Sequence, residues 1–115
     1  MNYQTANSLL QGRCKKSRKI GNNTYLKRRG DHISILYHNT DIIDYYPHKV
    51  VLRNGGWHTK TTKERLNEYS PVIIYQNNFE WYVVSPTNGV MNWDNPVLFK
   101  NNMAFDYNGQ ERINR

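Results

Sequence analysis

The sequence has 115 residues, the usual size of one domain, and its 37% hydrophobic content and mean hydropathy of −0.89 allow only a small core. No apolar run approaches the roughly 20 residues that span a membrane, no signal peptide is expected at the start, and the single Cys14 excludes an internal disulfide and fits a reducing cytosol. The formal net charge is +7, and its whole excess lies in residues 1–30, which carry +8 against −1 for the rest.

This uneven charge suggests a division of the chain. Residues 1–21 are expected to form a basic N-terminal segment, and residues 22–115 a single β-rich domain. Nine Tyr, three Trp and three Phe supply large burial areas, and aromatic residues favour strands over helices. A basic segment beside an aromatic-rich sheet indicates a polyanionic partner such as a nucleic acid, or an acidic protein surface.

The N-terminal half is expected to hold one helix followed by strands. A short helix is predicted over residues 4–11, with Thr5 as its N-cap and Gly12 as its stop. The polar, mutually repulsive residues 13–19 are expected to be extended. Alternating polar and apolar residues between turn signals then predict four strands, at residues 22–29, 32–38, 41–46 and 49–53.

A change from strand-like to helix-like sequence marks the centre of the chain. Gly55-Gly56 predicts a hairpin turn or bulge, followed by a short strand on which Trp57, Thr59 and Thr61 share one face. Thr61 and Glu64 have the spacing of a capping box, so a helix of about two turns is predicted over residues 62–69. Such a short helix is not stable alone and must pack against the sheet.

The remaining strand signals complete the predicted fold. Strands are expected at residues 72–76 and 79–84, joined by a two-residue turn at Asn77-Asn78, and weaker ones at 97–99 and 103–107. The fold class is therefore α+β. We expect a small, mostly antiparallel sheet or partly open barrel of about seven to nine short strands, with one short central helix and a short N-terminal helix.

Catalytic and metal-binding patterns are weak throughout. Cys14 lies among cations that would favour its thiolate, but no partner base can be assigned, so an exposed thiol is the simpler interpretation. The two glycines lack the P-loop pattern, and the histidines lack the spacing of metal ligands; they are His32, His38, His48 and His58. We therefore assign no catalytic residue, metal or cofactor, and expect a protein that is not an enzyme.

Basic side chains carry the clearest chemical signal. The predicted anion-binding or nucleic-acid-binding residues are Arg13, Lys15, Lys16, Arg18, Lys19, Arg28, Arg29, Lys60, Lys63 and Arg65. Tyr25 and Trp57 are the candidate stacking residues, within a wider set of aromatics that would serve if exposed: Tyr37, Tyr45, Tyr46 and Tyr82. The alternative for the basic residues is a solvated tail. For Trp57, the sequence favours a core anchor beneath the helix over a stacking platform.

A family resemblance rests on two strings of residues. Residues 52–67, LRNGGWHTKTTKERLN, contain the pattern GGW-x-T-x-TTK-x-R-x-N, and residues 38–42, HNTDI, contain H-x-T-D followed by a hydrophobic residue. Both resemble small tailed-phage proteins of the cyanophage type, and the similarity extends over roughly residues 4–85. The resemblance implies a phage-encoded accessory protein expressed in a bacterial host. It implies no reaction, so it transfers no catalytic residue.

Three hypotheses about function follow. The first is a non-catalytic phage accessory protein that binds nucleic acid or another phosphate-bearing ligand in the host bacterial cytoplasm. The second is an inhibitor of a host complex, such as a polymerase or a defence nuclease, whose acidic surface would receive the basic segment. The third and weakest is an enzyme, which would need several titratable groups to converge in a pocket. No membrane association is expected.

Overall fold

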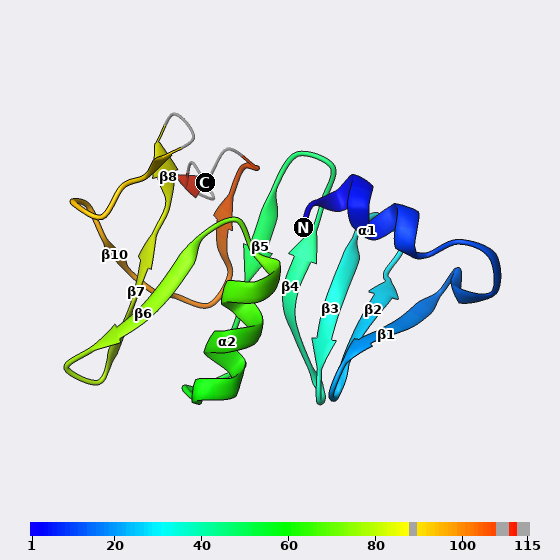
Figure 1. Cartoon of the computed structure of the whole chain (residues 1–115), viewed down its shortest axis with the longest axis horizontal. Helices are drawn as coiled ribbons and strands as arrows, with labels where there is room; N and C mark the ends of the chain where they lie inside the picture. The colour runs from blue at the N-terminus through cyan, green and yellow to red at the C-terminus, as the bar shows by residue number, and fades with distance from the viewer. Residues whose placement is uncertain (88–89, 108–110, 113–115) are drawn as a thin grey trace.

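Short antiparallel strands are the main regular structure of the chain (Figure 1). This computed structural model describes residues 1–87, 90–107 and 111–112. The larger sheet has seven strands, in the order β1 (Ser17–Gly21), β2 (Thr24–Arg28), β3 (Ile33–Tyr37), β4 (Thr40–Tyr45), β5 (Val50–Leu52), β11 (Met103–Phe105) and β12 (Glu111–Arg112). The smaller has three, in the order β10 (Val97–Leu98), β7 (Glu80–Val84) and β6 (Ile73–Asn77), and β8 (Pro86–Thr87) pairs with β9 (Val90–Met91).

The fold is therefore predominantly β rather than a balanced α+β structure, and it holds two main sheets rather than one. In the described residues β1 and β12 form the edges of the larger sheet, which is open. The division between residues 1–21 and 22–115 stays a prediction, with β1 hydrogen-bonded to β2 in the same sheet. Neither helix of the described residues has the length and apolarity to cross a bilayer.

Helix α1 (Tyr3–Leu9) starts one residue earlier than predicted. Its N-cap is Asn2, whose Oδ1 accepts a hydrogen bond from the backbone N–H of Thr5 at 2.9 Å. The predicted cap, Thr5, thus lies inside the helix. Its own backbone N–H is one of the amides at the helix start that the Asn2 side chain satisfies. Ala6 and Leu10 join the core beneath the helix.

A short 3₁₀ helix, η1 (Gly12–Cys14), leads into strand β1, which the sequence analysis did not predict. Strand β1 lies at the edge of the sheet, where Arg18 and Lys19 are exposed to solvent. Its sequence is therefore mostly polar. Charged residues are the usual protection of a sheet edge against pairing with another chain. The absence of apolar alternation is therefore compatible with a strand at this position.

The hairpin between β6 and β7 is confirmed, but its turn is shifted by one residue. Asn77 pairs with Glu80, so the turn consists of Asn78 and Phe79, which have φ angles of 50° and 65°. This register pairs Tyr75 with Tyr82, and their rings stack with centroids 5.7 Å apart. Cross-strand aromatic contacts of this kind stabilise a register.

Helix α2 (Lys60–Tyr69) begins earlier than the predicted residue 62, and the predicted capping box does not form. The N-cap is Thr59, whose Oγ1 accepts a hydrogen bond from the N–H of Thr62 at 3.3 Å. The predicted strand from Trp57 to Thr61 is also wrong, since residues 57–59 are irregular and the helix begins at Lys60. The earlier start buries Thr62 and Leu66 on one side of the helix.

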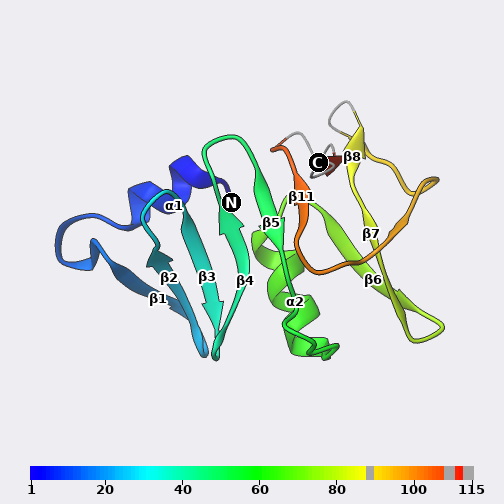
Figure 2. The ribbon, with the colours of Figure 1, turned by 180° about the vertical axis from the view of Figure 1, so that it is seen from behind.

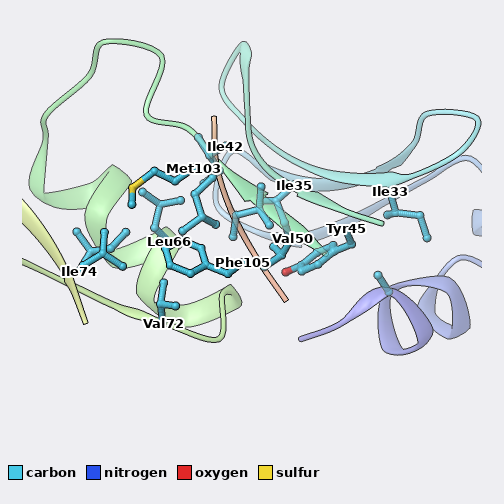
Figure 3. Close-up of a cluster of buried hydrophobic side chains, with 14 of the residues drawn as sticks. Ile33, Ile35, Ile42, Tyr45, Val50, Leu66, Val72, Ile74, Met103 and Phe105 are labelled. Atoms are coloured by element: carbon cyan, nitrogen blue, oxygen red, sulfur yellow. The ribbon is translucent and has the colours of Figure 1, made fainter. Parts of the chain in front are cut away.

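Helix α2 stands between the two sheets in both views (Figures 1 and 2). Leu66 is fully buried and lies among Ile74, Met103 and Phe105 (Figure 3). Asn67 binds the backbone of β6 at both ends of its amide, because its Nδ2 donates to the Ile74 carbonyl at 2.9 Å and its Oδ1 accepts from the Ile74 N–H at 2.6 Å. The expectation that the central helix packs against the sheet is confirmed.

We expect Leu66→Ala to lower the free energy of unfolding by about 2–5 kcal/mol, because it leaves a cavity between the sheets. Leu98→Ala is the matched control: Leu98 is 44% exposed on β10, so its removal should cost within about 0.5 kcal/mol. Urea unfolding followed by tryptophan fluorescence measures both. Similar losses for the two variants would contradict the position of Leu66 in the core.

Stability should also fall at alkaline pH. Burial raises the pKa of Tyr107 to about 12, whereas an unfolded tyrosine titrates near 10. The folded state therefore holds this phenol proton more tightly than the unfolded state. The contribution of Tyr107 to the free energy of unfolding is complete below about pH 10 and is lost towards pH 12. Tyr107→Phe should flatten this part of the curve in urea unfolding at pH 8–12, and parallel curves for the two proteins would contradict it.

Candidate functional site

The connection between α1 and β1 carries several exposed cations. Arg13, Lys15 and Lys16 are exposed there, and Lys19 follows on β1. In the described part of the chain, none of these four side chains has an acidic or hydrogen-bonding partner. The connection projects at one end of the molecule in both views (Figures 1 and 2). These four cations are therefore available to a ligand.

The outer face of the larger sheet continues this basic surface. Lys19 is directly paired with Tyr25 across the β1–β2 ladder, so the two side chains share a face. Lys27, two residues after Tyr25, shares it as well, and its Nζ lies 5.6 Å from the centroid of the Tyr25 ring. The predicted stacking residue Tyr25 is half-buried at this position, between two lysines.

Arg28 and Arg18, by contrast, hold α1 against the sheet. The Arg28 guanidinium donates to the Lys15 carbonyl at 3.0 Å, to Asn7 Oδ1 at 2.9 Å and to the Leu10 carbonyl at 3.2 Å. Arg18 donates to the carbonyl of Leu9 at 3.3 Å. A guanidinium with three acceptors inside the protein has few donors left for a phosphate.

Arg29 and Arg65 also have protein partners. Arg29 forms an ion pair with Asp41 at 2.9 Å. Arg65 donates from Nε to Thr24 Oγ1 at 3.1 Å and lies 3.4 Å from Glu68. Both arginines therefore have part of their charge or hydrogen-bonding capacity engaged within the protein.

The first turn of α2 forms a second basic region. Lys60 is exposed and lies 3.9 Å from Glu64, while Lys63 is half-buried without a side-chain partner among the described residues. This turn has no acidic residue, although acidic side chains commonly compensate the positive end of a helix. The predicted cations are thus brought together in two groups, one beside β1 and one on α2, and not on a single surface.

A pocket of about 370 Å³ lies beside the start of α2. One wall is the β3–β4 connection, and the other is the segment that enters the helix. Its lining residues are Tyr37, His38, Asn39, Thr40, Ile42, Asn54, Trp57, Thr59, Thr61 and Thr62. None of these is a carboxylate, lysine or arginine, so the lining is mainly polar and aromatic.

Asn54 is the least exposed polar group of the pocket, with 1% of its surface accessible. Its Oδ1 accepts from the Gly56 N–H at 2.8 Å, which fixes the orientation of the amide. Its Nδ2 is buried without a hydrogen-bond partner among the described residues. A buried donor in this state costs about 1–3 kcal/mol, so its position calls for an explanation.

Gly55 allows the turn to pass close to β4. Its φ of 63° favours glycine, and a Cβ at this position would lie 2.8 Å from Thr40 Cγ2 and 2.9 Å from Thr40 Oγ1. Gly56 also has a positive φ, of 86°, but a Cβ there would meet no atom within 4 Å. Thr40 lines the pocket, so the first glycine sets one of its walls.

The prediction that Trp57 anchors the core is wrong. Trp57 is 63% exposed, and Trp81 occupies the core instead, with 2% exposure and an edge contact to Phe99 at 5.4 Å between centroids. Trp57 follows the glycine turn, which is closed by a hydrogen bond from the Trp57 N–H to the Asn54 carbonyl at 2.9 Å. The alternative of a stacking platform stays a prediction.

Other predicted aromatics and titratable groups lie outside this pocket. Tyr45 is fully buried and donates to the carbonyl of Tyr69, so it offers no stacking face. The hydrogen bond from His32 lowers the pKa of Asp31, and burial raises the pKa of Tyr46 and of Tyr69. Among the described residues no three His, Cys, Asp or Glu side chains are grouped as metal ligands, and the absence of a metal stays a prediction.

The family described as Kyanoviridae Gp96 protein matches residues 2–106 of the chain. The chain belongs to the Kyanoviridae Gp96 family. This confirms the resemblance to tailed cyanophage proteins. No curated protein and no solved structure is detectably similar to the chain.

In this Kyanoviridae Gp96 family member, the two strings that carried the resemblance meet at the pocket. Residues 38–42 supply the β3–β4 connection and the start of β4, and residues 52–67 supply the turn and the first turns of α2. The pocket was not predicted, because the two strings lie apart in the sequence. Asn54 was not predicted either, and its only signal was an Asn before two turn-forming glycines.

Substitution of the two glycines tests this wall of the pocket. Gly56→Ala should cost about 1–2 kcal/mol for its positive φ, and Gly55→Ala about 1–3 kcal/mol more because of overpacking against Thr40. Any staggered χ1 of Thr40 leaves at least one of its two heavy atoms in the way. Urea unfolding measures the difference, and Thr40→Ala in the Gly55→Ala background should reduce it. Equal losses at both glycines would contradict the contact.

Proposed function

We propose that the chain is a non-catalytic phage accessory protein that binds nucleic acid, or another phosphate-bearing ligand, in the cytoplasm of the infected bacterium. The observation that carries the proposal is a group of exposed cations that have no partner among the described residues, Arg13, Lys15, Lys16 and Lys19. Phosphate groups bind such side chains with release of counterions, so affinity falls steeply with salt. Tyr25 and Lys27 extend the surface onto the sheet.

A single strand suits this surface better than a duplex. The basic connection and the outer face of β1 and β2 form a shallow surface with an aromatic ring between lysines, a combination that binds the backbone and one base of a single strand. No recognition helix projects from the described residues towards a groove of double-stranded DNA, because α1 and α2 both contribute buried residues to the core.

The second candidate is an inhibitor of a host protein complex, and a separate observation favours it. Large apolar side chains are exposed around the smaller sheet: Phe79 is 92% exposed, Trp93 58% and Leu98 44%. Exposed aromatic residues of this kind are enriched in protein interfaces. The basic connection would then provide electrostatic attraction to an acidic host surface.

The nucleic-acid proposal predicts a site-specific salt dependence. Lys15→Gln with Lys16→Gln should weaken binding of a single-stranded DNA 20-mer and reduce the slope of log affinity against log salt by about 1.4, or about 0.7 for each lost phosphate contact. Fluorescence anisotropy over a range of salt concentrations measures this slope.

A matched control removes the same charge elsewhere. The double variant Lys49→Gln, Lys100→Gln removes two lysines that lie outside the N-terminal segment. It should leave the slope of log affinity against log salt unchanged. Equal effects of the two pairs would show that only the net charge matters. No binding of the 20-mer at low salt would end the proposal, and capture of a host protein that resists nuclease would favour the second candidate.

A further inference from the structure

We propose that the pocket between the β3–β4 connection and the start of α2 binds a nucleotide, with the base against Trp57 and the phosphate at the first turn of α2. The pocket is distinct from the cationic connection, so this inference goes beyond the proposed function. Its volume of about 370 Å³ falls within the roughly 300–1,000 Å³ of small-molecule sites.

The buried amide of Asn54 points to a polar ligand. The side-chain Oδ1 already accepts a hydrogen bond from the Gly56 N–H. The other end of the amide, the donor Nδ2, is buried without a partner among the described residues. Heterocyclic bases present ring nitrogens and carbonyl oxygens as acceptors to such a donor. A purely apolar ligand would leave the amide unpaired, which disfavours that class.

Two aromatic side chains supply flat contact surface. Trp57 lines the pocket and is 63% exposed, so part of its indole is free to contact a ligand. Tyr37 lines the same pocket, and the Arg65 guanidinium lies 5.7 Å from its ring centroid. Arg65 is itself bound to Thr24, and the His38 ring lies 4.4 Å from the Tyr37 ring between centroids, so the tyrosine is held in place. Aromatic rings are the usual stacking partners of nucleobases.

The beginning of α2 provides for the phosphate. The N–H groups of Lys60 and Thr61 precede the first intrahelical hydrogen bond, and no acceptor for them exists in the described part of the chain. Hydroxyl groups gather at the same point, with Thr59 Oγ1 3.3 Å from Thr61 Oγ1 and 2.9 Å from Thr62 Oγ1. Lys63 adds positive charge without an acidic partner among the described residues, whereas Lys60 shares its charge with Glu64 at 3.9 Å. Free amides, hydroxyls and lysines together form an anion-binding arrangement.

This combination favours a nucleotide over a saccharide. Both classes contact aromatic rings and hydroxyl groups, but a neutral sugar gains nothing from a positive helix end flanked by two lysines. The pocket lining contains no carboxylate that would repel a phosphate. A planar base joined to a phosphate therefore fits both parts of the site.

Calorimetric titration of the full chain with adenosine 5′-monophosphate tests the inference. Trp57→Ala should weaken binding about 5- to 100-fold, because the stacking contact with the base is lost. Since Trp57 is largely exposed, its removal should not unfold the chain. Trp93→Ala is the matched control, since Trp93 is 58% exposed and lies outside the pocket. Equal effects of the two variants, or no binding by the unmodified chain, would overturn the inference.

Two further variants test the polar contacts. Asn54→Asp keeps the oxygen that accepts from Gly56 but loses the free donor, so binding should fall at least tenfold while circular dichroism shows that the chain stays folded. Lys63→Gln should weaken the monophosphate more than it weakens adenosine. Equal binding of adenosine and its monophosphate, or tighter binding of glucose than of either, would overturn the assignment of the phosphate or of the base.

Competition distinguishes a free nucleotide from a nucleotide within a strand. In the Lys15→Gln, Lys16→Gln background, displacement of the monophosphate by a single-stranded thymidine octamer would indicate a strand, and failure to displace it a free nucleotide. The two proposals also fail separately. If Trp57→Ala changes nothing while the lysine pair still weakens the 20-mer, the pocket inference is wrong and the proposed function stands.

Discussion

The packing of α2 between the two sheets is the constraint on which the rest of the structure depends. A helix of ten residues is not stable alone, and a sheet of three short strands needs an apolar face that is covered. Leu66 fills the space between them, and Asn67 bonds the helix to β6 through both ends of its amide. On the other side, Tyr45 of the larger sheet donates to the carbonyl of Tyr69. Each of the three elements therefore depends on the other two for burial and for hydrogen bonds.

The same packing decides which cations remain for a ligand. On β2, Arg28 points to the face covered by α1, where its guanidinium binds Asn7 and two carbonyl groups, whereas Lys27 points to the open face. Neighbouring residues of a strand alternate between faces, so one position in the sequence separates a structural cation from an accessible one. Arg65 shows the same principle on a helix, because its bond to Thr24 fastens α2 to β2. Charge counted along the sequence thus overstates the charge that a ligand meets.

Local patterns predicted those parts of the fold that local interactions determine. The alternation of residues 32–38 and the turn signals between strands anticipated β3, β4, β5, β6 and β7, and the helix at the centre was expected to pack on a sheet. The edge strand β1 was missed because its exposed residues have no apolar alternation. The cap of α2 was misplaced because three threonines compete for it, and the burial of Thr62 settles the choice in favour of Thr59. The pocket depends on contacts between residues 38–42 and 52–67, which no local pattern reveals.

The position of Trp57 is the feature that packing explains least. A tryptophan buries much apolar surface when it enters a core, and Trp81 does so here in contact with Phe99. Trp57 instead follows two glycines in left-handed conformations and stays largely in solvent. An alanine in place of Gly55 would collide with Thr40, so the turn that holds Trp57 outside requires a residue without a side chain. A turn this restricted, an exposed indole and a buried amide with a free donor occur within four residues of one another. Core packing requires neither the exposed indole nor the unpaired amide, and both line the pocket for which we propose a nucleotide.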